Sequence, residues 1–352
     1  MHWDLFCRVI DNFGDIGVGW RLSADLGARG HSVRLWLDDP AALAWMAPAG
    51  ASGVEVRHWT ADMQMPKPGE VVVEAFGCDP PPALVERMAR SARPPLWINL
   101  EYLSAEAYVR RSHGLRSPQL SGPGQGLDKW FFYPGFEPGS GGLMREPGLM
   151  AERQRFDGRA WLQARGLAAQ PGERVLSLFC YPGAPLCELL PALALAPTLL
   201  LVTPGGANQA LQAALAQQPM PPTLRCIALP WLSQSDYDRL LWACELNFVR
   251  GEDSFVRAMW SGAPFVWQIY PQHDAAHAAK LDAFLHLMLE SAEAPLDAAV
   301  RKLWLGWNGL RDGPLTLPEP SAWQMHALHW RGQLLAQVDL GSQLLGFVAE
   351  RR

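Results

Sequence analysis

The sequence predicts an α/β protein made of two successive Rossmann-like domains with parallel sheets, which face each other across a cleft. Short apolar runs typical of buried strands alternate with amphipathic helical stretches along most of the chain, and this alternation indicates parallel strands joined by right-handed crossovers. The 352 residues suit two domains better than one, and 49% hydrophobic residues can fill two cores.

Residues 1–148 hold the first alternating series and are expected to form the N-terminal domain. Strands are predicted at residues 3–10, 32–37, 71–75 and 96–99, with helices at 16–29, 41–46 and 82–92. Gly30 follows the first helix as a stop signal. Residues 117–148 are rich in glycine and proline, which predicts long loops next to a domain boundary.

Residues 149–330 hold the second series and are expected to form the C-terminal domain. Strands are predicted at residues 175–179, 198–202, 224–228, 246–249 and 265–267. Helices are predicted at 150–165, 185–193, 208–216, 236–243, 254–261 and 273–287. The tail over 322–349 also has helical spacing, and residues 331–352 form a helix that can pack back on the N-terminal domain.

Composition and charge exclude several classes of protein. The formal net charge of −5, from 30 basic and 35 acidic residues, argues against nucleic acid as the main partner. The six cysteines are scattered, without the spacing of a zinc site or a disulfide framework. No apolar run reaches the roughly 18 residues of a membrane span, and no signal-peptide layout opens the sequence. We therefore expect a soluble cytoplasmic protein without a membrane partner.

The stretch from Arg250 to Arg257 is the most informative in the chain. It follows an apolar run, so it predicts a buried strand that ends in a loop and opens a helix, a junction suited to a phosphate. Arg250 or Arg257 could bind a diphosphate, and Ser254 could add a neutral donor. Glu252 or Asp253 could orient an arginine or contact sugar hydroxyls. An internal ion pair of Glu252 or Asp253 with Arg257 is an alternative compatible with this interpretation.

A second constellation, Asp11 to Gly17, lies where the first strand passes into the first helix. Ligands of open parallel sheets bind beyond the carboxyl ends of the strands, so Asp11 and Asp15 should face the cleft. Gly14 and Gly17 would permit positive φ and close approach of a ligand. The alternative is that Asp15 merely caps the helix. The spacing does not fit the dinucleotide fingerprint.

Two further groups follow predicted strands of the second series. Gln234 stands between Trp231 and Tyr237, an amide among aromatic rings that suits a nucleobase. The alternative is a helix start capped by Ser235 or Asp236.

The phenol of Tyr181, after another strand, could reach a phosphate. His273 and His277 are four residues apart but lack a third ligand, so we expect no metal site there.

Four long segments resemble the EarP family, bacterial protein-arginine rhamnosyltransferases that modify translation elongation factor P. They are FCRVIDNFGDIGVGWRL at 6–22, INLEYLSAE at 98–106, FFYPGFEPGSGGLMRE at 131–146 and NFVRGEDSFVRAMWSGAPFVWQIYPQ at 247–272. The resemblance spans nearly the whole chain. It implies the GT-B glycosyltransferase fold and an inverting transfer of rhamnose, without a metal or other cofactor, from dTDP-β-L-rhamnose to one arginine of elongation factor P.

The resemblance also implies roles for individual residues. Asp11 and Asp15 correspond to the essential aspartates of the family, with Asp15 as the base, and Glu252 corresponds to its essential glutamate. The donor-binding positions of the family map onto Arg250, Asp253, Ser254, Gln234 and Tyr181. Trp231 and Tyr237 are expected to pack on the nucleobase. Independently of the resemblance, Gly14 is expected to allow close approach of the donor because it has no side chain.

Two alternatives remain from the residues themselves. One is a GT-B transferase with a different acceptor, such as a lipid or small glycan, although the chain has no basic amphipathic membrane segment. The other is a non-catalytic nucleotide-sugar-binding protein, which would not need the carboxylate pair of Asp11 and Asp15.

Overall fold

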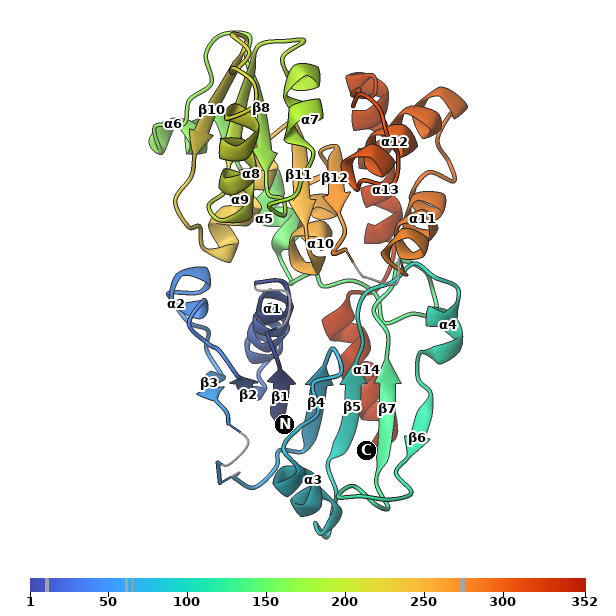
Figure 1. Ribbon diagram of the computed structural model, residues 1–352. Helices are drawn as coiled ribbons and strands as arrows, with labels where there is room; N and C mark the ends of the chain where they lie inside the picture. Colours follow the sequence, from blue (N-terminus) through green and yellow to red (C-terminus); the bar gives the residue numbers. More distant parts are fainter. Residues whose placement is uncertain (10–12, 61–62, 65, 272–275) are drawn as a thin grey trace. The chain divides into compact units, whose positions relative to one another are not determined.

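The computed structural model describes residues 1–9, 13–60, 63–64, 66–271 and 276–352. Within this part of the chain, the protein folds into two compact units (Figure 1). The first unit comprises Met1–Pro147 and Ala336–Arg352, and the second comprises Gly148–Leu335. The described residues contain no helix with both the length and the hydrophobicity needed to cross a bilayer.

The first unit is built on a sheet of seven strands with the order β3-β2-β1-β4-β5-β7-β6. The strands are β1 (His2–Cys7), β2 (Ser32–Leu37), β3 (Val54–His58), β4 (Val71–Ala75), β5 (Leu96–Leu100), β6 (Arg116–Pro118) and β7 (Asp128–Phe132). All pairs are parallel except β6–β7. The helices are α1 (Gly14–Ala28), α2 (Leu43–Met46), α3 (Pro82–Ala89), α4 (Tyr108–Ser112) and α14 (Leu340–Arg351).

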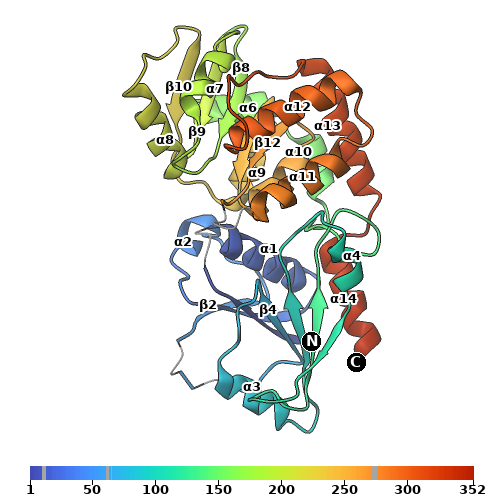
Figure 2. The ribbon, with the colours of Figure 1, turned by 45° about the vertical axis from the view of Figure 1, so that its right-hand side comes forward.

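Helices cover both faces of this sheet because its strands are apolar on both sides. Leu5 and Cys7 of β1 belong to one core cluster, with side chains of α1 and α14. Phe6, which points the other way, belongs to a second cluster with side chains of α3. Figure 2 shows α1 and α14 on the side of the sheet away from α3.

The late helix α14 is an integral part of the first unit. Leu344 and Phe347 are buried in the same cluster as the side chains of α1. Arg29, which follows α1, donates from Nε to Oδ2 of Asp25 at 2.9 Å and from its terminal nitrogens to Asp339 at 2.7 Å and Ser342 at 2.8 Å. One guanidinium therefore links the end of α1 to the start of α14.

The second unit is built on a parallel sheet of five strands with the order β10-β9-β8-β11-β12. The strands are β8 (Arg174–Leu178), β9 (Thr198–Val202), β10 (Leu224–Ala228), β11 (Leu246–Arg250) and β12 (Phe265–Gln268). The helices are α5 (Leu149–Arg155), α6 (Gly158–Ala164), α7 (Leu186–Leu193), α8 (Gly206–Leu215), α9 (Gln234–Ala243), α10 (Glu252–Ser261), α11 (Ala276–Met288), α12 (Ala294–Trp307) and α13 (Pro320–Leu335). β9 and β11 are buried along their whole length, as central parallel strands should be.

The predicted α/β architecture with parallel sheets is confirmed, but three local predictions are wrong. Residues 117–148 are not only loops, because β6 and β7 add two strands to the sheet there. The single helix expected over 150–165 is two helices, since Asp157 caps the second by accepting from the N–H of Ala160 at 3.0 Å. The helical tail is likewise divided into α13 and α14.

Strand β3 and helices α4 and α12 were not predicted from the sequence. β3 lies at the edge of the sheet and exposes most of its residues, so its sequence carries no apolar run. Edge strands lack the continuous hydrophobic pattern of central parallel strands.

Candidate functional site

The junction predicted from the charged stretch of the second unit is confirmed. β11 ends at Arg250, Gly251 is the N-cap residue, and α10 begins at Glu252. Gly251 has φ 65°, a conformation that favours glycine over residues with a side chain. Its carbonyl accepts from Nε1 of Trp267 on the neighbouring strand at 3.0 Å. The first N–H groups of α10 thus start at the carboxyl edge of the sheet, where an anion is favoured.

The guanidinium of Arg250 lies against two aromatic rings at this edge. Its Cζ atom is 4.6 Å from the ring centroid of Phe179 and 4.4 Å from that of Tyr181. The backbone N–H of Tyr181 donates to Oε1 of Gln268 at 2.8 Å, which ties the segment after β8 to the end of β12. Cation–π contacts of this kind orient a guanidinium through its face, whereas its N–H groups point outward in its plane.

The other predicted donor-binding residues of this unit gather around the same junction. Gln234, the first residue of α9, donates from Nε2 to Oδ2 of Asp253 at 3.0 Å. The hydroxyl of Ser254 donates to the carbonyl of Arg250. These contacts bring α9 and α10 together at their N-terminal ends.

Aromatic side chains lie next to this group. The ring of Tyr237 meets Phe179 edge-on at 5.7 Å, and its hydroxyl is buried beside Ser254, so burial raises the pKa of Tyr237 well above its usual value. Trp231 is 47% exposed. The exposed indole of Trp231 offers an aromatic face on which a planar ring could stack.

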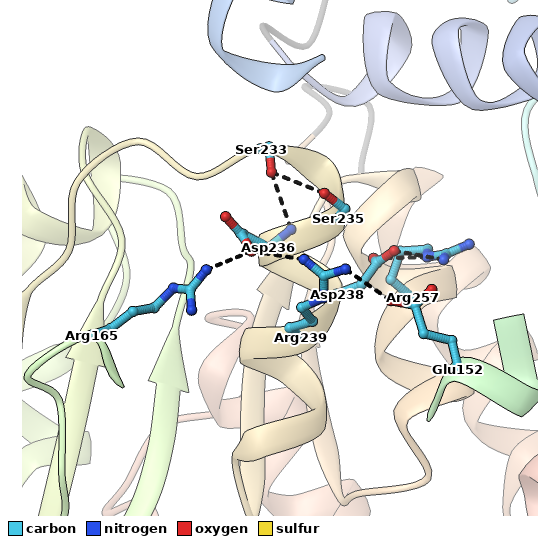
Figure 3. A network of polar contacts seen from close by, with 8 residues as sticks. All are labelled: Glu152, Arg165, Ser233, Ser235, Asp236, Asp238, Arg239 and Arg257. Atoms are coloured by element: carbon cyan, nitrogen blue, oxygen red, sulfur yellow. Dashed lines mark hydrogen bonds and ion pairs between the residues drawn. The ribbon is translucent and has the colours of Figure 1, made fainter. Parts of the chain in front are cut away.

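Arg257, one of the two candidate anion binders, has a different role. Its side chain is 2% exposed, and it donates from Nε at 2.9 Å and from a terminal nitrogen at 2.7 Å to the two carboxylate oxygens of Asp238 (Figure 3). This bidentate pair joins α10 to α9 beneath the surface. Arg257 is engaged in this buried ion pair, so Arg250 remains as the anion-binding candidate.

A more exposed set of ion pairs surrounds the start of α9. Asp236 accepts from Arg165 at 2.9 Å and from Arg239 at 3.2 Å, and Arg239 also donates to Glu152 at 3.0 Å (Figure 3). The alternative in which Ser235 or Asp236 caps this helix is wrong. The cap is Ser233, whose hydroxyl accepts from the N–H of Asp236 at 3.2 Å.

In the first unit, Asp15 lies in the first turn of α1 and is 3% exposed. The N-cap residue is Phe13, so the alternative in which Asp15 caps the helix is wrong. Burial, together with the Asp15 carboxylate, raises the pKa of the Cys7 thiol well above its usual value, which places Asp15 near the end of β1. Asp11 lies outside the described residues.

Gly14 and Gly17 do not use the positive φ that glycine permits. Both residues are part of the helix α1, and neither has φ in the left-handed region. Gly14 opens the helix beside Asp15, where the absence of a side chain still permits close approach.

Some residues at these edges carried no functional prediction. Gln268 and Phe179 hold the segment around Tyr181 and Arg250. In the first unit, Glu101 directly follows β5 and so lies at the same sheet edge as the end of β1. The signal for Glu101 is its position, a carboxylate immediately after a buried strand.

Among the residues that the structure describes, no three His, Cys, Asp or Glu side chains are grouped as a metal would require. His277 is in α11, whereas His273 lies outside the described residues.

Comparison with known proteins gives one consistent result. The family model described as elongation factor P rhamnosyltransferase EarP matches residues 3–349. A protein-arginine rhamnosyltransferase from Pseudomonas putida is 44% identical, over 98% of each chain. One from Pseudomonas aeruginosa is 42% identical, over 99% of each chain.

Solved structures agree. A structure concerned with EarP-mediated arginine glycosylation of elongation factor P superposes with a TM-score of 0.68 and 33% identity, covering 99% of each chain. The calicheamicin glycosyltransferase CalG4 superposes with a TM-score of 0.51 and 15% identity over 99% of this chain and 98% of its own. The second likeness concerns the fold alone, which is that of GT-B glycosyltransferases.

Proposed function

The chain belongs to the EarP family of elongation factor P rhamnosyltransferases, and from that premise we propose that it transfers rhamnose from dTDP-β-L-rhamnose to an arginine of elongation factor P. The observation that best supports a nucleotide-diphosphate donor is the position of Arg250. Its guanidinium lies against the rings of Phe179 and Tyr181 beside the N-terminus of α10, so an anion bound there would meet both a cation and the first N–H groups of a helix.

Different residues around Arg250 would bind different parts of the donor. The diphosphate would accept from Arg250, from the N–H groups of α10 including that of Ser254, and from Tyr181. Gln234 and Asp253 would hydrogen-bond the nucleobase or its sugar, with Trp231 and Tyr237 packed on the ring.

The acceptor nitrogen belongs to a guanidinium whose pKa is about 12.5–13.8, so a carboxylate in water cannot simply remove its proton. In our proposal the nitrogen attacks the anomeric carbon while Asp15 takes its proton, and the bond from that carbon to the diphosphate oxygen breaks with the electron pair leaving on dTDP. Asp11 would orient the guanidinium. Gly14, which has no side chain, would allow close approach of the donor.

Charge develops on the departing diphosphate during this step. Arg250 and the N-terminus of α10 would stabilise that charge more in the transition state than in the ground state. Glu252 stands in the first turn of α10, and we assign it to the donor sugar and the network around it. No step needs a metal or another cofactor. The acceptor is a translation factor, so we also infer that the protein acts in the cytoplasm.

The decisive experiment is the intact mass of elongation factor P after incubation with this protein and dTDP-β-L-rhamnose. We expect a gain of one deoxyhexose, and no gain when the target arginine is replaced by lysine. Consumption of dTDP-rhamnose without modified elongation factor P would favour a different acceptor. Binding of dTDP-rhamnose without consumption of it would favour a non-catalytic protein.

A further inference from the structure

A half-buried carboxylate, Glu101, stands at the carboxyl edge of the first sheet with no role yet assigned. It accepts from Nδ2 of Asn99 at 2.8 Å, from the backbone N–H of Tyr102 and from the hydroxyl of Tyr133. Burial, with the neighbouring Glu101 charge, raises the pKa of Tyr133 to about 12, so this phenol keeps its proton and donates it. Three donors leave a carboxylate with room for at least one more. Glu101 is thus fixed in place yet able to bind a further donor.

An aromatic pair lies beside this carboxylate. The rings of Phe76 and Tyr102 are stacked, with centroids 4.4 Å apart and planes 17° apart. Phe76 directly follows β4, and its N–H donates to the carbonyl of Leu100 at 2.7 Å. Tyr102 is 37% exposed. The pair therefore presents an aromatic surface next to Glu101.

The backbone of Phe76 is unusual. Among the described residues it is the one non-glycine residue with φ in the left-handed region, at 58°. Bulky residues rarely adopt this conformation, and where it persists it tends to mark a functional position. The ring of the same residue is the one that stacks on Tyr102.

The sheet register relates this group to Asp15. Cys7 of β1 pairs with Ala75 of β4, and Ala75 pairs with Leu100 of β5. Neighbouring strands are about 4.8 Å apart, so the ends of β1 and β5 are separated by roughly 10 Å with the end of β4 between them. Asp15 lies near Cys7, Glu101 follows Leu100, and Phe76 follows the middle strand.

From this arrangement we propose that Glu101 and Tyr102 complete the binding site for the acceptor guanidinium, with Glu101 on the side opposite Asp15 and the Phe76–Tyr102 pair packed against the guanidinium face. A guanidinium carries five N–H donors in one plane and can donate to carboxylates on two sides through bonds of about 2.8 Å. Its face packs on aromatic rings. The inference rests on the proposed function, because it takes an arginine as the acceptor.

A double-mutant cycle between the two proteins tests the contact. The full-length protein, unchanged or as Glu101→Gln, is titrated in the presence of dTDP with elongation factor P carrying arginine or alanine at the target position. We expect Glu101→Gln to weaken binding of the arginine form about tenfold and to leave binding of the alanine form unchanged. Equal losses of affinity for the arginine and alanine forms would overturn the proposal, because Glu101 would then support the fold without contacting the target arginine.

Three further variants distinguish a direct contact with the acceptor arginine from a general loss of folding or binding. Glu86→Gln removes a carboxylate from α3, which Figure 1 shows at the opposite edge of the same sheet, and should bind like the unchanged protein. Tyr102→Phe keeps the aromatic ring and should bind elongation factor P like the unchanged protein. Tyr102→Leu should raise KM for elongation factor P several-fold and leave KM for dTDP-rhamnose unchanged.

Identical KM values for Tyr102→Leu and the unchanged protein would contradict the aromatic part of the site. Transfer by the unchanged protein is the reference throughout. If the unchanged protein transfers no rhamnose to elongation factor P, the proposed function is wrong. If it does transfer rhamnose, and Glu101→Gln binds elongation factor P as well as Glu86→Gln does, only the inference about Glu101 is wrong.

Discussion

Asp238 and Arg257 form a bidentate ion pair in which both side chains are almost fully buried, at 6% and 2% side-chain exposure. The pair joins α9, which begins at Gln234, to α10, which begins just after Arg250. It fixes the spacing between the two helix N-termini that carry the proposed donor site.

Replacing Asp238 by alanine should leave Arg257 charged and buried without its carboxylate. We expect the free energy of unfolding to fall by about 3–5 kcal/mol, since a buried charge loses its partner. Urea unfolding at neutral pH measures this change. Asp236→Ala removes a carboxylate from the more exposed pairs of the same helix and should cost less than about 1 kcal/mol. Equal losses in the two variants would contradict the structural role of the buried pair.

Arg250→Lys should weaken binding of dTDP by about 10- to 100-fold. Lysine keeps the positive charge but lacks the planar fork that can pair with a diphosphate and pack against Phe179 and Tyr181. Isothermal titration with dTDP gives the affinity. Arg225→Lys, which alters a guanidinium paired with Glu173 in the same unit, is the control. Unchanged affinity in Arg250→Lys would remove Arg250 from the donor site.

Asp15→Asn should bind dTDP-rhamnose normally and lose turnover. If Asp15 accepts the proton of the acceptor nitrogen, its loss should lower kcat by about 10²–10⁴-fold. Single-turnover mass spectrometry and titration of dTDP-rhamnose give the two quantities, with exposed Asp39→Asn as the control. Loss of donor binding by a variant that remains folded would argue against Asp15 as the base.

Protonation of His113 at low pH should weaken the packing of α14 on the first unit. Burial and the charge of Arg351 lower the pKa of His113. Its Nδ1 accepts from the N–H of Tyr133 at 3.1 Å, and its ring packs on Phe132 and Phe347.

Because the folded pKa lies below the unfolded value of about 6.5, this stabilisation is complete above pH 6.5 and is lost as the pH falls through the folded pKa. Melting temperatures between pH 7.5 and 5 should therefore fall less steeply in His113→Gln than in the unchanged protein. Exposed His58→Gln should follow the unchanged protein. Parallel curves for all three would exclude His113 as a source of the pH dependence.

Much of this structure could be predicted from local sequence patterns. The central strands are short apolar runs, and the turn from β11 into α10 is visible in the order Arg250, Gly251, Glu252. Edge strand β3 could not be found in this way, because its exposure removes the apolar pattern.

Interactions between distant residues could not be predicted either. Nothing local relates Asp238 to Arg257, which meet only because α9 packs beside α10. A role for Glu101 could not be predicted for the same reason, because its position relative to Asp15 depends on the register that aligns β1, β4 and β5. The roles of the donor-site residues remain predictions that the experiments above address.

Helix α14 has a consequence for how the protein is made. Leu344 and Phe347 belong to the core of a unit whose other residues end at Pro147. A ribosome therefore completes the whole second unit, Gly148–Leu335, before it supplies these side chains. Until then, part of the apolar core of the first unit is exposed to solvent. We therefore expect the nascent chain to need chaperones until α14 emerges from the ribosome.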